Sequence, residues 1–282
     1  MQPNLIFIFS DQQHWQAAGY QDSHFRTPNM DRLAGRGTVF DHAFCTTPLC
    51  SPSRSTLMTG LYPHKTGVVD NGVPLEMDTI APRLQEAGYY TAYFGKWHLR
   101  DRDVATSGWD AQHGVYDEYE PPNRPLSDQE VEDDALDFLD RHSDDDRPFA
   151  LFLSFDEPHG IYAIIPDGPY GNDHAPIPPV APDTALPHGW HEPGLERTPV
   201  PYDDLFNEQK RRPYAGGDED LWRRYREFYR DRVAAYDRRL GRVLDRAEAR
   251  GLLDSSVVFV TSDHGDMDAH HRLLFKGPHM FD

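Results

Sequence analysis

The sequence predicts an α/β protein with a mostly parallel central sheet flanked by helices. Short apolar runs of strand length alternate along the chain with longer segments of helical spacing. The clearest runs are Leu5 to Ser10, Tyr89 to Phe94, Phe149 to Phe155 and Val257 to Ser262. Polar residues follow these runs, and open parallel sheets bind ligands beyond the carboxyl ends of their strands. The 282 residues allow one large domain or two smaller ones, and we expect one domain over residues 1–282.

The chain is strongly acidic. Its 28 basic and 47 acidic residues give a formal net charge of -19. Nucleic acids and anionic membranes need a basic face, so we expect neither as a partner. The acidity is best interpreted as a solvated surface. The sequence does not predict an oligomeric state.

The first ten residues read as a strand. They contain no basic segment and only a five-residue apolar run, and no run in the chain is long enough to cross a bilayer. We therefore expect a soluble cytoplasmic protein. Two cysteines, Cys45 and Cys50, cannot form a disulfide scaffold, and a bridge between them would be unusual in a reducing cytosol.

The first strand ends at two polar residues, Asp11 and Gln12. Carboxylate and amide oxygens suit a hard divalent cation, although an Asp after a strand is also a common turn residue. Thr27 to Ala34 then has the cap, the proline and the following glycines of a short helix. Thr38 to Phe44 alternates like a strand that leads to the segment around Cys50.

Cys50 precedes Pro52, which suits a first helical turn, so its side chain is predicted at a helix N-terminus. Free N–H groups and the helix dipole favour an anion there, and Arg54 can add a bidentate clamp. The same field lowers the pKa of a thiol. The residues alone fit a buried structural cysteine in a capped helix equally well.

This segment resembles the signature of the type I sulfatases. The matching residues are Cys-x-Pro-Ser-Arg followed by Ser-Thr-Leu-Met-Thr-Gly-Leu-Tyr-Pro-His, residues 50–64. In that family the cysteine is oxidised to formylglycine, whose hydrated aldehyde presents a metal-bound hydroxyl as the nucleophile. The resemblance implies that Cys50 is the formylglycine precursor, that a formylglycine-generating enzyme matures it, and that the fold is alkaline phosphatase-like.

A second segment, Gly-Lys-Trp-His-Leu at residues 95–99, follows a helix over Thr79 to Ala87 and the strand over Tyr89 to Phe94. In an extended chain Lys96 and His98 would point to one side and Trp97 to the other. Alone, this would be an exposed pair at a strand end. The segment is similar to the second sulfatase signature, which implies that Lys96 contacts the sulfate and that His98 helps deprotonate the diol.

The strand over Phe149 to Phe155 ends in Asp-Glu-Pro-His, residues 156–159. By the resemblance His159 is a general acid for the leaving group. The acidic helix predicted over Ser127 to His142 is interpreted as a solvated face. Residues 160–217 form a loop-rich insertion near the active site, and Asp218 to Arg250 has the apolar stripe of a long helix.

The last strand is followed by Asp263 and His264, whose side chains both suit a divalent ion. The segment resembles the distal metal and sulfate-binding segment of the sulfatases. This implies a metal site of Asp11, Gln12, Asp263, His264 and the Cys50-derived group, with Lys276 on the ester oxygens. Ca²⁺ is the expected ion, with Mn²⁺ and Mg²⁺ as alternatives.

Three hypotheses follow. The first is a sulfuric ester hydrolase that cleaves a small-molecule or carbohydrate sulfate monoester. The second is a phosphonate monoester or phosphodiester hydrolase on the same scaffold, because relatives of that kind share the Asp-Gln start. The third is a non-catalytic remnant. Sulfatases that resemble this chain continue into a smaller C-terminal subdomain, so we expect a truncated catalytic domain.

Overall fold

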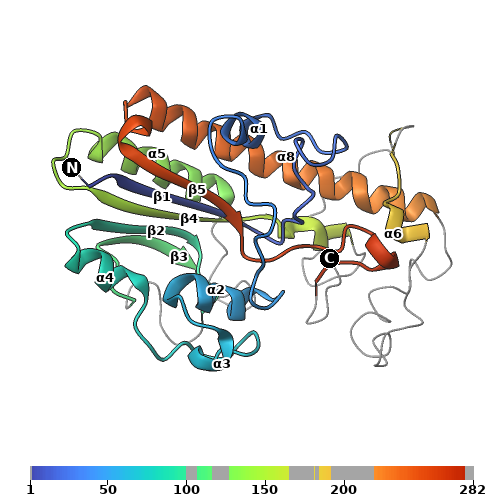
Figure 1. Cartoon of the computed structure of the whole chain (residues 1–282), viewed down its shortest axis with the longest axis horizontal. Helices are drawn as coiled ribbons and strands as arrows, with labels where there is room; N and C mark the ends of the chain where they lie inside the picture. The colour runs from blue at the N-terminus through green and yellow to red at the C-terminus, as the bar shows by residue number, and fades with distance from the viewer. Residues whose placement is uncertain are drawn as a thin grey trace.

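A parallel five-stranded sheet forms the centre of the computed structural model (Figure 1). The structure describes residues 2–99, 107–115, 127–164, 181, 184–191 and 219–276. The strands are β1 (Asn4–Asp11), β2 (Tyr90–Lys96), β3 (Ala111–Val115), β4 (Phe149–Pro158) and β5 (Ser256–Ser262). They lie in the order β3-β2-β4-β1-β5, and every neighbouring pair is parallel. The predicted fold class is confirmed.

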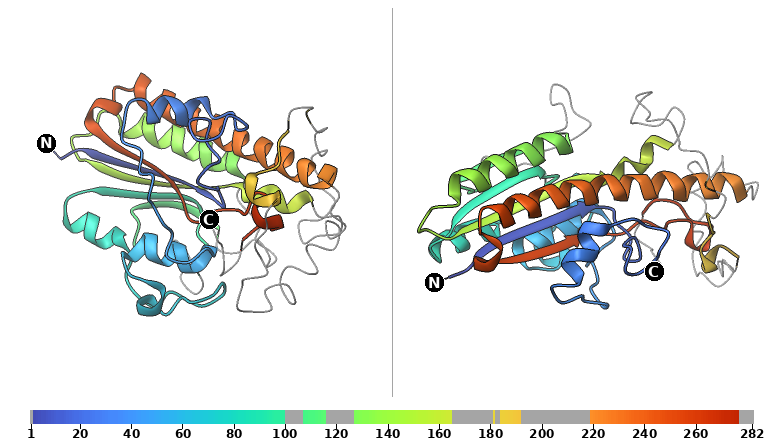
Figure 2. Two further views of the ribbon diagram at one scale, coloured as in Figure 1. Left: turned by 45° about the vertical axis from the view of Figure 1, so that its right-hand side comes forward. Right: turned by 90° about the horizontal axis from the view of Figure 1, so that it is seen from above.

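Helices cover both faces of the sheet (Figures 1 and 2). One face carries α1 (Pro28–Ala34), α5 (Asp128–His142) and α8 (Glu219–Ala249); the other carries α2 (Cys50–Thr59), α3 (Pro63–Thr66) and α4 (Ile80–Glu86). Shorter elements are η2 (His159–Ile164), α6 (His188–His191), η5 (Leu253–Ser255) and η6 (His270–Arg272). Parallel strands need such crossovers, which explains the two helical layers.

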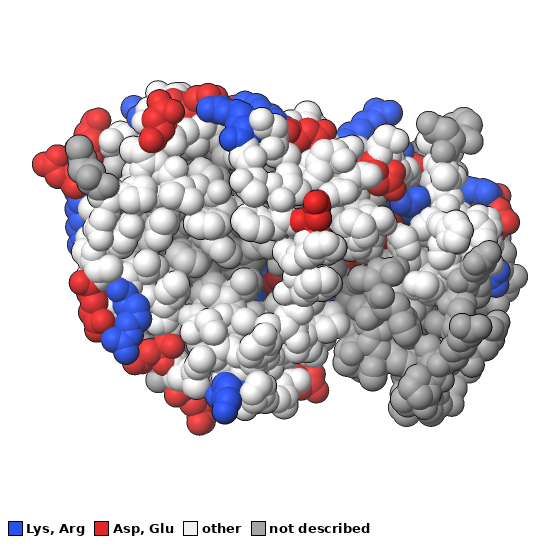
Figure 3. All heavy atoms as spheres, in the orientation of Figure 1, with Lys and Arg blue, Asp and Glu red and all other residues white. Residues whose placement is uncertain are grey.

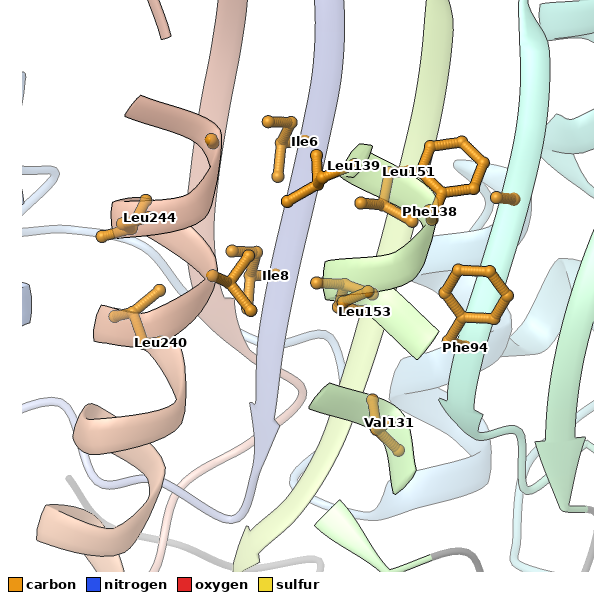
Figure 4. Packing of buried hydrophobic residues seen from close by; sticks show 14 of the residues in the cluster. Ile6, Ile8, Phe94, Val131, Phe138, Leu139, Leu151, Leu153, Leu240 and Leu244 are labelled. Atoms are coloured by element: carbon orange, nitrogen blue, oxygen red, sulfur yellow. The ribbon is translucent and has the colours of Figure 1, made fainter. Parts of the chain in front are cut away.

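The largest core lies between the sheet and helices α5 and α8. Alternate residues of β1, Ile6 and Ile8, face this layer, while Phe9 points to the opposite core. Figure 4 shows the packing, with Ile6, Ile8, Phe94, Val131, Phe138, Leu139, Leu151, Leu153, Leu240 and Leu244 labelled. Each buried large aliphatic side chain contributes about 1.5–3 kcal/mol by transfer from water. This packing holds the strand ends that carry the polar residues.

Helix α5 is fixed to the end of β4. Ser127 and Glu130 form a capping box, which explains where the helix begins. The buried Asp128 carboxylate accepts the backbone N–H of Asp156 at 2.7 Å and that of Glu157 at 3.1 Å. The start of one helix thereby sets the direction in which β4 delivers its terminal residues.

One predicted element was wrong and one observed element was missed. Thr38 to Phe44 forms no strand, because it pairs with none of the described strands; Phe40 is 75% and Phe44 is 86% exposed. The edge strand β3 was not predicted, since its five residues include Gly114 and the polar Gln112 and His113.

The proposed insertion over residues 160–217 falls largely outside the described residues. No helix in the described ranges is both long and apolar enough to cross a membrane.

Candidate active site

The carboxyl ends of β1 and β5 bring the carboxylates of Asp11 and Asp263 together. The strands run in register to Ser10 opposite Ser262, and the Asp263 N–H donates to the Ser10 carbonyl at 3.1 Å. Asp263 Oδ1 accepts the backbone N–H of Gln12 at 3.1 Å and that of His264 at 2.8 Å. Ser10, Gln12, Asp263 and His264 are buried, and Ser262 is partly buried. The parallel register therefore places residues from opposite ends of the chain in one site.

Cys50 is the first residue of α2 and points into this site. Its Sγ lies 3.3 Å from His264 Nε2 and 3.7 Å from Asp11 Oδ1. One ligand atom from each of Asp11, Cys50, Asp263 and His264 falls within 4.8 Å of the others. Leu49 is extended and Gly60 adopts φ 72°, so the helix begins at the cysteine and ends in a left-handed glycine. The predicted helix N-terminus is confirmed.

Arg54, one turn into α2, joins the two carboxylates. Its Nε donates to Asp263 Oδ2 and an Nη donates to Asp11 Oδ2, both at 2.9 Å. The other Nη donates to the Ser154 hydroxyl at 2.8 Å and to the Lys96 carbonyl at 2.6 Å. The side chain is 1% exposed. Arg54 therefore holds ligand candidates in place, whereas the sequence suggested an anion clamp; that role stays a prediction.

Two lysines complete the positive charge around Asp11. Lys96 Nζ lies 3.0 Å from Asp11 Oδ2 and 2.9 Å from Asp156 Oδ1. Lys276 Nζ donates to Cys50 Sγ at 2.6 Å and lies 3.1 Å from His264 Nε2. Burial alone would raise the pKa of Asp11, but Lys96 and Lys276 outweigh it and hold that pKa well below its usual value.

The same charges act on the cysteine. Burial and the Asp11 carboxylate oppose the thiolate, yet Lys276, His264 and a hydrogen bond from His159 outweigh them. The pKa of the Cys50 thiol is therefore held well below its ordinary value. A cluster that stabilises negative charge at this position suits an oxyanion as well as a thiolate.

The two predicted catalytic histidines lie on different elements; the His159 side chain hydrogen-bonds Cys50, whereas His98 contacts the neighbouring Ser51 through its backbone. His159 begins η2, is 4% exposed and has its Nδ1 3.7 Å from Asp156 Oδ1. His98 follows β2, and its carbonyl accepts the Ser51 hydroxyl at 2.7 Å. Its φ of 54° takes the chain out of extended geometry, so strand alternation does not set the direction of the His98 ring. Trp97 is buried in the opposite core, as the alternation predicts.

Sequence reasoning missed three groups that support the site. Asp266 accepts a hydrogen bond from Gln12 Nε2 at 2.7 Å and from the Tyr225 hydroxyl at 2.8 Å. The Tyr229 hydroxyl donates to the Gln12 carbonyl at 2.7 Å and accepts the His14 N–H at 2.8 Å. The sequence pattern assigned both tyrosines to the apolar stripe of α8. Their hydroxyl groups, four residues apart on one face, were the available signal.

The donor set fits a hard divalent cation. Gln12 Oε1 is buried and accepts no hydrogen bond from any described residue, beside a cluster of two carboxylates and an imidazole. Oxygen-rich ligand sets of this kind suit Ca²⁺, Mg²⁺ or Mn²⁺. Asp11, Gln12, Asp263 and His264 are therefore the residues that would hold the ion.

Comparison with known proteins identifies the family of the chain. A family model described as Sulfatase matches residues 3–278. The chain belongs to the sulfatase family. Among its relatives, an ulvan-active sulfatase of Formosa agariphila is 28% identical over 292 residues, which cover 94% of this chain and 51% of the relative. An N-acetylglucosamine-6-O-sulfatase of Bacteroides thetaiotaomicron is 28% identical over 331 residues, which cover 95% of this chain and 59% of the relative.

Solved structures agree on the fold. A 2-O GAG sulfatase superposes with a TM-score of 0.76 at 24% identity, covering 100% of this chain and 62% of the other. The phosphonate monoester hydrolase of Agrobacterium radiobacter superposes with a TM-score of 0.70 at 23% identity, covering 99% and 66%. This sulfatase-family chain spans between half and three fifths of the length of these curated relatives.

Proposed function

We propose that this chain is the catalytic part of a sulfuric ester hydrolase in which Cys50 is converted to formylglycine. One observation carries the proposal: Cys50 Sγ lies at a helix start among Asp11, Asp263 and His264, with Lys276 Nζ at 2.6 Å. A structural cysteine needs no such neighbours. The membership of the family supports the same reaction class.

A divalent cation bound by Asp11, Gln12, Asp263 and His264 would act as a Lewis acid on the ester oxygens. The chain itself supplies three further cations, Arg54, Lys96 and Lys276. Lys96 and Lys276 flank Asp11 from two sides, at 3.0 and 3.6 Å. These charges are fixed before substrate arrives, so they stabilise developing negative charge without reorganisation.

Formylglycine, as its hydrated aldehyde, would supply one hydroxyl oxygen for attack on sulfur, with the proton of that hydroxyl passing to solvent. Deprotonation of the second hydroxyl would let the aldehyde reform with loss of sulfate, and water would then rehydrate the aldehyde. His159 gives a proton to the departing alcohol oxygen. His98 takes the proton of the second hydroxyl; its Nδ1 is buried and makes no hydrogen bond within the described ranges. Each histidine thus moves one proton per turnover.

The proposed substrate is a sulfated carbohydrate. The ulvan-active and the N-acetylglucosamine-6-O- relatives are named for substrates of this kind. The alternative is a phosphonate monoester or phosphodiester, which Gln12 and the likeness to the Agrobacterium enzyme support. The proposed partner in maturation is a formylglycine-generating enzyme.

Paired substrates test the proposal. The chain is produced with a formylglycine-generating enzyme, and its rates on 4-nitrophenyl sulfate and on 4-nitrophenyl phenylphosphonate are compared. We expect a higher kcat/KM for the sulfate ester, abolished by Cys50→Ala and retained by Cys45→Ala, which alters an exposed cysteine outside the cluster. A higher value for the phosphonate would favour the alternative. Loss of neither activity in Cys50→Ala would exclude both mechanisms.

A further inference from the structure

The side chain of Gln12 is held by a network that no part of the proposed reaction uses directly. Its Nε2 donates to Asp266 Oδ2 at 2.7 Å. Asp266 Oδ1 also accepts the backbone N–H of Asp268 at 2.7 Å, and the Tyr225 hydroxyl lies 2.8 and 3.0 Å from the two carboxylate oxygens. Asp266 is completely buried. Its carboxylate is therefore surrounded by donors.

The proton positions in this network follow from one backbone group. The Phe275 N–H donates to the Tyr225 oxygen at 3.0 Å, so the hydroxyl proton of Tyr225 points the other way, toward Asp266. Two donors that do not depend on the Gln12 amide, the Asp268 N–H and the Tyr225 hydroxyl, are directed at Asp266, so its carboxylate acts as an acceptor. The group of Gln12 that faces Asp266 must then be its NH₂, and its carbonyl oxygen faces the opposite side.

That carbonyl oxygen is the buried atom without a donor beside the cation cluster. Had the amide the opposite orientation, two N–H groups would point at the cluster and repel a cation. The backbone of Gln12 is fixed independently, with φ 72°, its N–H on Asp263 and its carbonyl on Tyr229. The contact with Asp266 therefore determines only the orientation of the Gln12 side-chain amide.

We propose that Asp266, itself held by Tyr225, is a positioning residue that selects the amide orientation of Gln12 and so presents Gln12 Oε1 to the cation. The inference rests on the proposed metal site. It also makes residues 12 and 266 a matched pair: an amide requires a carboxylate opposite it, and a carboxylate at position 12 requires an amide at position 266.

Cation affinity tests the pair directly. Ca²⁺ is titrated into the EDTA-stripped matured chain by calorimetry, which reports Kd without any turnover. In Asp266→Asn the amide oxygen is needed to accept the Asp268 N–H, so the NH₂ group faces Gln12 and the Gln12 amide flips to offer its oxygen. We expect Kd to rise at least about tenfold, as for other groups that orient metal ligands.

A double-mutant cycle separates pairing from the simple addition of charge. Gln12→Glu is measured with Asp266 and with Asp266→Asn. We expect the substitution to tighten Ca²⁺ binding at least about tenfold more when residue 266 is Asn, because the Asn NH₂ then donates to Glu and leaves its second oxygen for the ion. Additive effects on Kd would overturn the pairing.

Tyr225→Phe removes one donor from Asp266 while keeping the ring, and Kd should rise roughly threefold. Tyr236→Phe is the matched control, since this buried tyrosine lies on the same helix and its hydroxyl has no hydrogen-bond partner among the described residues. It should leave Kd unchanged. Melting temperatures in EDTA establish that each variant folds.

The outcomes separate this inference from the proposed function. A wild-type chain that binds no Ca²⁺, Mg²⁺ or Mn²⁺ would overturn both the metal site and the positioning role. Wild-type binding with an unchanged Kd in Asp266→Asn and Tyr225→Phe would overturn only the positioning role. Weakened binding in both variants, with Tyr236→Phe unchanged, would support it.

Discussion

Strand β5 joins two regions of opposite character. Its carboxyl end delivers Asp263 and His264 into a buried cluster, where charges are paired within the chain. Its body is the outer strand of the described sheet, with Val257 40% and Phe259 47% exposed. The face shown in Figure 3 carries its charged side chains mainly around the rim, with few charges in the middle.

The two regions differ in the kind of partner that their unsatisfied groups favour. In the cluster, Gln12 Oε1 has no hydrogen-bond partner among the described residues, and it is an oxygen suited to a cation. Along β5, the described residues leave apolar surface exposed and the hydrogen-bonding groups of an edge strand unpaired. Both features favour contact with another polypeptide. The proposed chemistry would therefore depend on a small ion, and we expect self-association in solution to depend on β5.

The largest effect is expected from breaking the charge pairing in the cluster. Arg54→Ala leaves the Asp11 and Asp263 carboxylates buried without their guanidinium, which should reduce the free energy of unfolding by about 3–5 kcal/mol. Urea denaturation measures it. Arg83→Ala is the control, because this 75% exposed residue pairs with Glu86 on the surface and should cost less than about 0.5 kcal/mol. Equal losses would contradict the account.

The pH dependence of stability tests a second buried carboxylate, Asp128, which lies at the start of α5 against the end of β4 and outside the cation cluster. Burial, with the Asp156 charge, raises its pKa to about 6. A raised pKa in the folded state stabilises the fold at low pH, and this stabilisation is lost as the pH rises through 6. From pH 4 to pH 7.5 the wild type should lose on the order of 2 kcal/mol relative to Asp128→Asn. Parallel pH profiles of urea unfolding would refute this.

Substitutions on β5 are expected to have the smallest effect on the free energy of unfolding and the largest effect on self-association. Val257→Lys with Phe259→Lys places two charges on the exposed edge, which should reduce self-association while changing the free energy of unfolding by less than about 1 kcal/mol. Sedimentation velocity measures the oligomer fraction. Tyr62→Lys, at a 62% exposed residue on another element, is the control. A wild type that stays monomeric at high concentration would show that the edge is self-protected.

The sequence predicted the parts of this molecule that local patterns encode. Apolar runs located β1, β2, β4 and β5, and the residues after them met at one edge because parallel strands align their carboxyl ends. The helix start at Cys50 followed from Pro52. The signature motifs supplied the remaining site residues and their expected roles.

Other parts depend on contacts between distant segments. Residues 38–44 alternate like a strand, but strand formation needs a partner strand that the described residues do not provide. Tyr225 and Tyr229 look like core residues on α8 because periodicity records burial and not where a hydroxyl group points. The binding of Arg54 to two carboxylates follows from its tertiary neighbours and not from its place in the motif.

The central claim is that Cys50 is the precursor of the catalytic group, and mass spectrometry tests it most directly. The chain is produced with a formylglycine-generating enzyme, and the tryptic peptide of residues 37–54 is analysed. Cys45 lies in the same peptide and is an internal control. The account predicts conversion of Cys50 to the aldehyde with Cys45 unchanged. An unmodified Cys50, under conditions that convert a known sulfatase, would contradict the formylglycine mechanism.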